Sequence, residues 1–291
     1  MTASVPAPVG AAAGRRARAG VAVAGRRPST LRLGLRRGGL ELKMYWRSGE
    51  AVVFNFAFPL LMLALLGSIY GGEVPGTGVS ASQLLVAGVM AASLMSVSYS
   101  NLAISIAVER GDGTLKRLAL LPLAPASYFI GKVVMVLVCA VTVNALTLAM
   151  GVALYDVQLP STPTKWAILA ATFFFGVVTC SLLGIAFSRV ARTAKAAPAV
   201  VMPVFVVLQF ISGVWVPLDL LPETLKAIAA LFPLRWLVQG MRAALLPDTF
   251  LAIEPTGTWQ LPLTFAMLVG WSIVAFVLCL MTFRWRGRGE S

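Results

Sequence analysis

Few side chains in this sequence could act as nucleophiles, acid–base catalysts or metal ligands. The chain contains no histidine, which excludes Ser-His-Asp and Cys-His catalytic systems and any metal site with histidine ligands. Cys139, Cys180 and Cys279 lie far apart in apolar stretches without a CxxC spacing, so we expect small apolar side chains in helices rather than disulfides or zinc ligands. The sequence therefore predicts no catalytic residue, no metal site and no cofactor within this chain.

Charged residues that could still have a specific role gather in one segment, ERGDGTLKRLALLP, which runs from Glu109 to Pro122. Glu109 and Asp112 are close, but a membrane enzyme of lipid metabolism would need a larger cluster of acids or histidines. The glycines at 111 and 113 are expected to end one helix, Thr114 to cap a short new one, and Pro122 to end it. The new helix would have an apolar face and a basic face, formed respectively by Leu115, Leu118 and Ala119 and by Lys116 and Arg117. Such a helix is either a docking element for a soluble partner or an ordinary basic loop.

Long apolar stretches must hold this segment in place. Of the 291 residues, 58% are hydrophobic and 12% are charged, which is about half the usual charged share of a soluble domain. A soluble domain of this length could not bury so much apolar surface, and a disordered chain needs low hydrophobicity. We therefore predict an integral membrane protein. Its spans are helices, because each of six stretches can cross a hydrocarbon core about 30 Å thick: Ala51–Tyr70, Ser82–Val108, Tyr128–Leu154, Trp166–Phe187, Pro198–Val216 and Leu261–Phe283.

The distribution of basic residues predicts the orientation of these spans. If the N-terminus is cytoplasmic, the inside segments hold 20 of the 24 lysines and arginines and the outside segments hold four. Cytoplasmic loops carry such an excess of positive charge. We predict a multi-pass protein of the plasma membrane with both termini in the cytoplasm, and we assign the net charge of +13 to orientation rather than to nucleic-acid binding.

Both ends of the chain are basic. Residues 1–30 are rich in Ala, Pro, Gly and Arg, lack the apolar core of a signal peptide, and are expected to be a disordered cytoplasmic tail. Residues 284–291 are expected to form a second cytoplasmic tail. Residues 31–50 predict an amphipathic helix along the inner leaflet, held by anionic lipid headgroups, although Gly38 and Gly39 are expected to interrupt it. A basic linker is the alternative for this segment.

Some polar residues fall inside the predicted spans. Candidates for lining a transport pathway are Asn55, Asn101, Asn144 and Gln209, with nearby aromatic and serine side chains that include Phe54, Phe58, Ser93 and Ser96. The alternative is that these amides and hydroxyls join helices to one another by hydrogen bonds. Carboxylates are absent from the middle of every predicted span, which counts against an ion-coupled carrier.

Residues 217–246 contain short apolar pieces separated by prolines, and no piece is long enough to span a bilayer. This pattern suits re-entrant or interfacial helices on the outer side. The alternative is an amphipathic loop that lies on the bilayer surface.

Two groups of residues resemble the permease subunits of ABC transporters of the type-two export class, which includes daunorubicin-resistance exporters and polysaccharide or nodulation-factor exporters. The first group is Glu109, Arg110, Gly113, Thr114, Leu115, Leu118 and Pro122. The second group is Gly213, Pro217, Pro222, Pro233, Gly240 and Arg242. The resemblance covers most of the chain from about residue 31, and the basic N-terminal tail departs from it.

This resemblance implies a role for each group. The residues around Gly113–Leu121, including Lys116, would form a coupling helix in a cleft of an ATP-binding subunit, with Glu109 and Arg110 fixing its base. The second group would form two short outer helices that re-enter the membrane before the last span. The chain has no GxxxxGK[ST] sequence, so ATP and magnesium would bind to a separate ATPase chain. A second permease chain would complete a homodimer or heterodimer.

The expected fold is an all-α membrane protein with an N-terminal interfacial helix, a six-span permease domain over residues 51–283, a cytoplasmic coupling helix and a re-entrant outer helix pair before the last span. The expected function is that of an exporter subunit, not an enzyme in itself, which moves an amphipathic, lipid-like, drug-like or glycan substrate. An ion-coupled carrier and a membrane scaffold that anchors a partner remain as alternatives.

Overall fold

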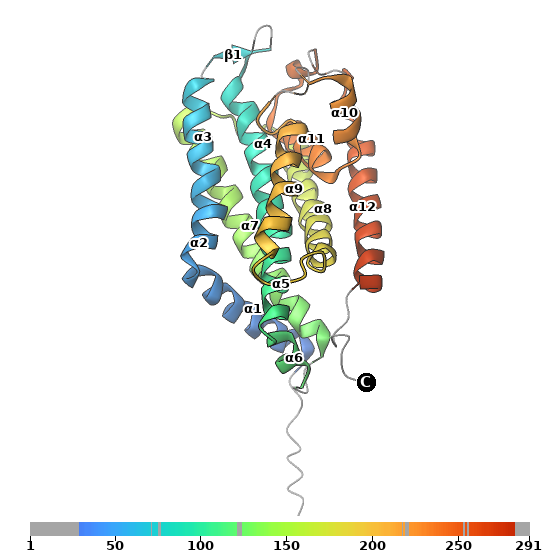
Figure 1. Ribbon diagram of the computed structural model, residues 1–291. Coiled ribbons are helices and arrows are strands. Elements are labelled where there is room, and N and C mark those ends of the chain that lie inside the picture. The colour runs from blue at the N-terminus through green and yellow to red at the C-terminus, as the bar shows by residue number, and fades with distance from the viewer. Residues whose placement is uncertain are drawn as a thin grey trace, which may run out of the picture.

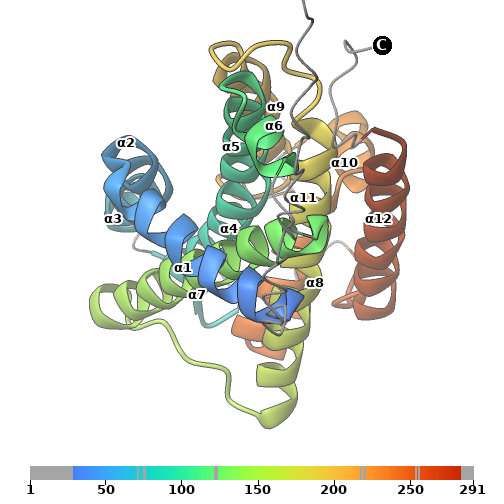
Figure 2. The ribbon, with the colours of Figure 1, turned by 90° about the horizontal axis from the view of Figure 1, so that it is seen from below.

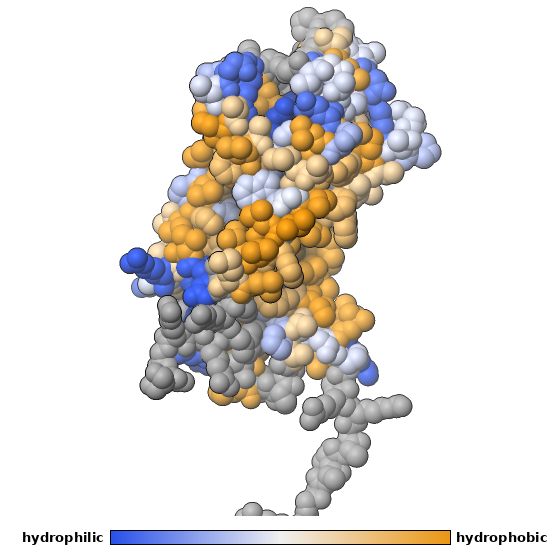
Figure 3. All heavy atoms as spheres, turned by 90° about the vertical axis from the view of Figure 1, so that its right-hand side faces the viewer, coloured by the Kyte–Doolittle hydropathy of each residue, from blue (hydrophilic) through white to orange (hydrophobic). Residues whose placement is uncertain are grey.

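The computed structural model describes residues 29–70, 72–74, 77–120, 124–216, 218, 221–252, 254 and 256–282. Within this part of the chain, five helical segments are long and apolar enough to cross a membrane: Gly49–Ile69, Ala81–Gly111, Pro125–Tyr155, Pro163–Phe187 and Leu261–Met281. They closely follow five of the six predicted stretches and confirm an all-α membrane protein. Figure 3 shows a hydrophobic belt across one face, with hydrophilic residues gathered towards its two ends.

Two of these five segments contain π-helical turns. The first segment consists of α2 (Gly49–Val52), the π-helix η1 (Val53–Ala57) and α3 (Phe58–Ile69), and the second of α4 (Ala81–Met95), the π-helix η2 (Ser96–Asn101) and α5 (Leu102–Gly111). The remaining elements are α1 (Thr30–Arg47), β1 (Glu73–Val74), β2 (Val79–Ser80), α6 (Thr114–Ala119), α7 (Pro125–Tyr155), α8 (Pro163–Phe187), α9 (Ala197–Ile211), α10 (Glu223–Ala230), α11 (Pro233–Leu245), the 3-10 helix η4 (Asp248–Ala252) and α12 (Leu261–Thr282).

The second segment forms the centre of the bundle, and α12 lies at its edge (Figures 1 and 2). The most apolar stretch of the second segment is 89% buried, whereas that of α12 is 17% buried. Small residues in α4 allow this central position because they let neighbouring backbones approach closely. At Gly88, for example, a Cβ atom would lie only 2.6 Å from the carbonyl oxygen of Val214.

Helix α9 is shorter than the predicted stretch Pro198–Val216. It ends at Ile211 after 15 residues, which gives a length of roughly 22 Å. The chain turns there because Gly213 has a positive φ of 80°, a conformation that glycine adopts without strain. Pro203 lies within the helix. By length, α9 therefore does not join the five segments above.

The two ends of the bundle carry different short elements. Helix α6, the start of α7 and the last turn of α12 lie at the lower end in Figure 1, with α1 crossing beneath the bundle. Helix α10 and the antiparallel hairpin of β1 and β2, which the sequence did not predict, lie at the upper end. Helix α11 is almost entirely buried and packs against α4, α8 and α12. Residues 1–28 of the predicted N-terminal tail, the predicted tail at 284–291, and the candidate residues Pro122 and Pro217 lie outside the described residues. The last two residues of the predicted N-terminal tail, Ser29 and Thr30, instead cap and begin α1.

Candidate functional site

Helix α6 begins after a sharp turn at the lower end of α5. Gly113 holds the N-cap position with φ 73°, and its carbonyl accepts a hydrogen bond from the Arg117 amide at 3.0 Å. Thr114 is the first helical residue and makes no cap with its side chain, so its predicted capping role is wrong. Glycine occupies the cap because the reversal between α5 and α6 requires a positive φ.

The apolar face of α6 is turned into the protein. Leu115 is 7% exposed and belongs to the main hydrophobic core, and Leu118 is partly buried against that core. Lys116 and Arg117 are exposed, and Leu120, directly after the helix, is 86% exposed. The exposed surface of α6 and the residue after it is therefore basic with one apolar side chain, whereas the leucine face predicted from the sequence is turned inward.

The two charged residues that end α5 hold it to different neighbours. Glu109 accepts a hydrogen bond from the Tyr128 hydroxyl at 2.7 Å and from the Lys132 ammonium at 2.5 Å, both on α7. Arg110 donates to the carbonyl of Ala191 in the segment between α8 and α9. The base of α6 is thus attached to α7 on one side and to the α8–α9 connection on the other.

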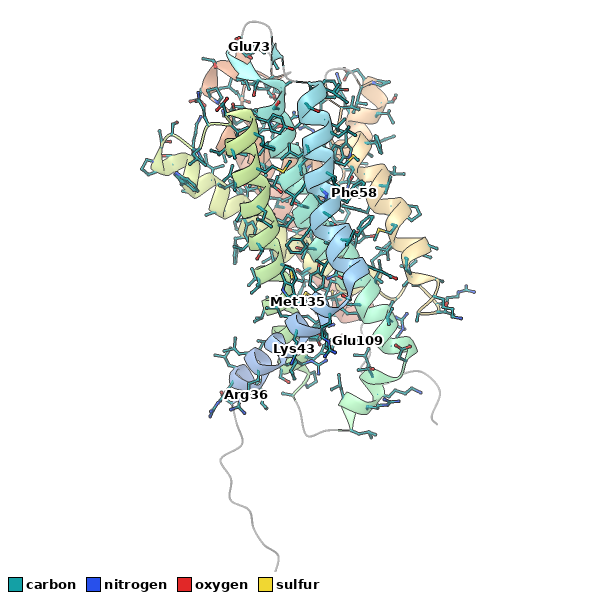
Figure 4. The ribbon with its side chains drawn as sticks, turned by 90° about the vertical axis from the view of Figure 1, so that its left-hand side faces the viewer. Arg36, Lys43, Phe58, Glu73, Glu109 and Met135 are labelled. Carbon is teal, nitrogen blue, oxygen red and sulfur yellow. The ribbon has the colours of Figure 1, made fainter. Side chains whose placement is uncertain are left out.

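Two further charged residues join this site that the sequence reasoning missed. Lys132 lies in α7 and is 1% exposed, and its ammonium is also 2.8 Å from a carboxylate oxygen of Glu41 on α1. Figure 4 shows Glu109 where α1 passes the lower end of α5. Signals were present in the sequence, because Lys132 falls inside a predicted span and Glu41 is an isolated acid in a basic segment.

Helix α1 runs along the first part of α7, as Figure 2 shows from below. It is continuous from Thr30 to Arg47, so the predicted interruption at Gly38 and Gly39 is wrong. Gly34 and Gly38 are buried against Ile130 and Val134 of α7, where a Cβ atom would lie 2.5–2.7 Å from side-chain carbons. The glycines therefore serve close helix packing, in the small-xxx-small pattern of membrane helices. Large apolar side chains of α1 stay exposed: Leu31, Leu35, Leu40, Met44 and Trp46.

A small cavity, with room for about one water molecule, lies between the first two segments, α9 and the turn after α9. Gln209 lines this cavity and accepts a hydrogen bond from the indole N–H of Trp215 at 2.9 Å. The other lining residues include several that the sequence singled out, and they are Phe54, Phe58, Pro59, Val89, Ala92, Ser93, Ser96 and Phe205. The wall is aromatic with a few hydroxyl and amide groups.

The other three amides occupy different positions. Asn55 accepts a hydrogen bond from Ser96 at 2.6 Å and thereby joins η1 to η2. Asn101 lines a separate groove between α1, α5 and α7. Asn144 is buried in α7, where its amide donates to the carbonyl of Ala140 at 3.0 Å and its Oδ1 has no hydrogen-bond partner among the described residues. Of the four candidate amides, Gln209 is therefore the one that lines the cavity.

The predicted outer group comes together around α11. Arg242 is 5% exposed and donates to the carbonyl of Gly213 at 3.0 Å, which ties α11 to the turn that ends α9. Gly240 faces Thr172 of α8, whose hydroxyl would be 2.5 Å from an added Cβ. Pro222 and Pro233 stand at the starts of α10 and α11, where proline needs no amide donor.

Comparison with known proteins gives a family match and several similar proteins. Residues 40–246, from within α1 to the end of α11, match the family described as ABC-2 type transporter. The chain is 27% identical over 234 residues to the inner membrane transport permease YadH of Escherichia coli strain K12, an alignment that covers 79% of this chain and 85% of YadH. The YadH proteins of E. coli O157:H7 and Shigella flexneri are similar to the same extent.

Proposed function

This chain belongs to the ABC-2 type transporter family, and from that premise we propose that it is the permease subunit of an exporter driven by a separate ATP-binding subunit. Helix α6 is the observation that carries this proposal. Its leucines anchor it to the bundle, its base is attached to α7 and to the α8–α9 connection, and its basic side chains are exposed. A force applied to such an anchored helix would pass into the transmembrane helices rather than bend a loop.

Recovery of the partner tests the proposal. We expect this chain, extracted in a mild detergent, to bring down an ATP-binding subunit encoded beside it, and the pair to hydrolyse ATP. Isolation of the chain without an ATPase, although both proteins are expressed together, would contradict the proposal.

The proposed orientation places α6 and both termini in the cytoplasm. Basic side chains near the α6 end support it, among them Lys116, Arg117, Arg192 and Lys195. In this topology α9 is the fifth of six crossings in spite of its length, and α10 and α11 form the re-entrant pair that completes the outer half. The exposed leucines of α1 would lie in the inner leaflet beside anionic headgroups.

Thiol labelling tests this orientation. A cysteine introduced by Glu223→Cys should react with a membrane-impermeant reagent added to intact cells, because Glu223 starts α10 on the proposed outer side. A matched cysteine introduced by Thr193→Cys, also at an exposed position, should react only after the cells are opened. The reverse pattern would overturn the topology.

We assign the cavity at Gln209 to the transport pathway, and an amphipathic or lipid-like molecule to its substrate. Aromatic walls with few polar groups support that class. A second permease chain, identical or related, would enclose the pathway, since the cavity lies at the surface of one chain where Phe58 is 39% exposed.

Replacement of one lining tryptophan tests the pathway. Trp215→Leu removes an aromatic wall and the donor to Gln209. An aromatic contact is worth about 0.5–1.5 kcal/mol, so we expect ATP-driven transport of a fluorescent phospholipid in proteoliposomes to fall by about two- to tenfold. Trp271→Leu is the matched control, because that indole also donates to a carbonyl, that of Leu231, but lies on α12 away from the cavity. Equal effects of the two substitutions would contradict the assignment.

A further inference from the structure

Three elements that are far apart in the sequence meet at one buried ammonium. Lys132 on α7 lies 2.8 Å from Glu41 on α1 and 2.5 Å from Glu109 on α5. The side chains of Lys132 and Glu41 are 1% and 4% exposed, and that of Glu109 is 16% exposed. Glu41, Glu109 and Lys132 are called the ion cluster below.

Neighbouring side chains complete the ion cluster. Arg37 donates to the second oxygen of Glu41 at 2.8 Å, and the Tyr128 hydroxyl donates to the second oxygen of Glu109 at 2.7 Å. The Arg37 guanidinium also lies over the Tyr128 ring, 5.0 Å from its centre. All four carboxylate oxygens therefore have a donor, and two negative charges meet two positive charges.

The ion cluster has a mechanical consequence. A buried ion pair adds little net stability, because desolvation offsets the attraction, but removal of one partner leaves a charge buried alone, which is strongly destabilising. Separation of the three helices at this point would therefore cost a large free energy. The parts concerned are the C-terminal end of α5, the start of α7 and the middle of α1. The glycine contacts of α1 reinforce this, since Gly34 and Gly38 pack directly on α7.

Helix α1 leads directly into the first transmembrane segment. One residue, Ser48, separates it from α2, and the Ser48 amide and hydroxyl both bond to carbonyls at the end of α1. The Tyr45 ring also packs against Phe56 of η1, with ring centres 6.3 Å apart. A movement of α1 would thus displace η1 and α3 directly, because the connection is short and hydrogen-bonded.

We propose that Lys132 is a positioning residue that joins α1 to the end of α5, directly before α6. A displacement of α6 would then move the first transmembrane segment as well as the second. This inference rests on the proposed function, because it takes the ATP-binding subunit as the source of the displacement. It adds a second route for the motion, from the foot of α5 through Lys132 to α1 and then to the cavity wall at Phe54 and Phe58.

Two reporter thiols test this route without knowledge of the substrate. Phe58→Cys reports on the first segment and Phe210→Cys on α9, and both positions are partly exposed. The three natural cysteines are replaced by alanine, and the complex with its ATPase is treated with a maleimide dye with and without ATP. With Lys132 present, we expect ATP to change the reaction rate at both reporters by about fivefold or more.

The variant Lys132→Met should lose the ATP response at Phe58→Cys and keep it at Phe210→Cys. Lys165→Met is the matched control, because Lys165 is a mostly buried lysine that pairs with Asp248 at the other end of the bundle. It should leave both responses unchanged. A full response at Phe58→Cys in the Lys132→Met complex would overturn the inference alone. Absence of any response in the complex with Lys132 would overturn both the inference and the proposed function.

A second set of variants covers the case that Lys132→Met does not fold. The triple variant Glu41→Gln, Glu109→Gln and Lys132→Met leaves none of the three charges of the ion cluster, so it avoids a lone buried carboxylate. It should fold, bind the ATPase and lack the response at the first reporter. Retention of that response would contradict the positioning role.

A cross-link tests whether α1 and α7 move together. In Gly38→Cys with Val134→Cys, the two Cβ atoms would be close enough for a disulfide after a small shift, because a Cβ at Gly38 lies 2.8 Å from the Val134 Cβ. Oxidation should leave the ATP response at Phe58→Cys intact. Its loss on oxidation would show that α1 slides along α7 and would overturn the inference.

Discussion

Replacement of Leu120 by Asp together with Arg117 by Glu is expected to abolish binding of the ATP-binding subunit without unfolding the permease. Among the described leucines around α6, Leu120 is the most exposed, and Arg117, three positions before it, is exposed as well. Both side chains can be buried by a partner, and loss of such central contacts commonly costs about 2 kcal/mol or more each. We therefore expect at least about a hundredfold weaker binding, measured by co-purification and by titration of the purified subunits.

Two controls separate docking from folding. Leu40→Asp changes a leucine that is 63% exposed on α1, outside α6, and should leave ATPase binding unchanged. Leu115→Asp places a charge at a position that is 7% exposed and should destabilise the chain. The loss should exceed that of a Leu→Ala change in a core, which costs about 2–5 kcal/mol, because a charge is also buried. If the Leu120 and Arg117 double variant binds the ATPase normally, α6 is not the docking helix.

Two adjacent glycines in α1 are expected to respond to alanine with opposite signs. At Gly38 an added Cβ would lie 2.7 Å from a γ-carbon of Val134 and 2.8 Å from its β-carbon, so Gly38→Ala must push α1 off α7. Overpacking of this kind costs about 1–3 kcal/mol. At Gly39 the added Cβ meets nothing within 4 Å, and alanine should stabilise the helix by about 0.5–1 kcal/mol.

The melting temperature of the detergent-solubilised protein measures this difference. Gly38→Ala should lower it and make α1 more sensitive to limited proteolysis, whereas Gly39→Ala should leave it equal or higher. Equal behaviour of the two variants would mean that α1 does not pack on α7 and is held by lipid alone.

The sequence predicted most of the architecture because the membrane imposes strong local constraints. Apolar stretches must be about 20 residues long to cross a bilayer as helices, and five of the six predicted stretches are such helices. Failures occurred where backbone conformation decided the outcome. Gly213 ends α9 early, and Gly113 rather than Thr114 caps α6. A glycine in a sequence does not reveal whether it breaks a helix, as at 213, or lets two helices touch, as at 38.

The candidate site was predicted only in part. The turn and the short helix after α5 were predicted from their glycines and charges, and Gln209 with Phe54 and Phe58 does line one cavity. The coupling role of that helix stays a prediction. The amphipathic pattern of α6 correctly placed Leu115 and Arg117 on different faces. The leucine face, however, packs against the core of this chain rather than facing outward. A pattern identifies an apolar face without showing whether that face meets the same chain or another one.

By itself, then, the sequence determined the class of protein, five of the six predicted spans and the family, because hydrophobicity and motif spacing act locally along the chain. Only the tertiary structure decided which distant residues meet. Glu41, Glu109 and Lys132 are separated by 68 and 23 positions, and each reads as an ordinary basic or acidic residue of a membrane-edge segment. Their pairing follows from the crossing of α1, α5 and α7, where burial leaves each charge stable only beside an opposite one.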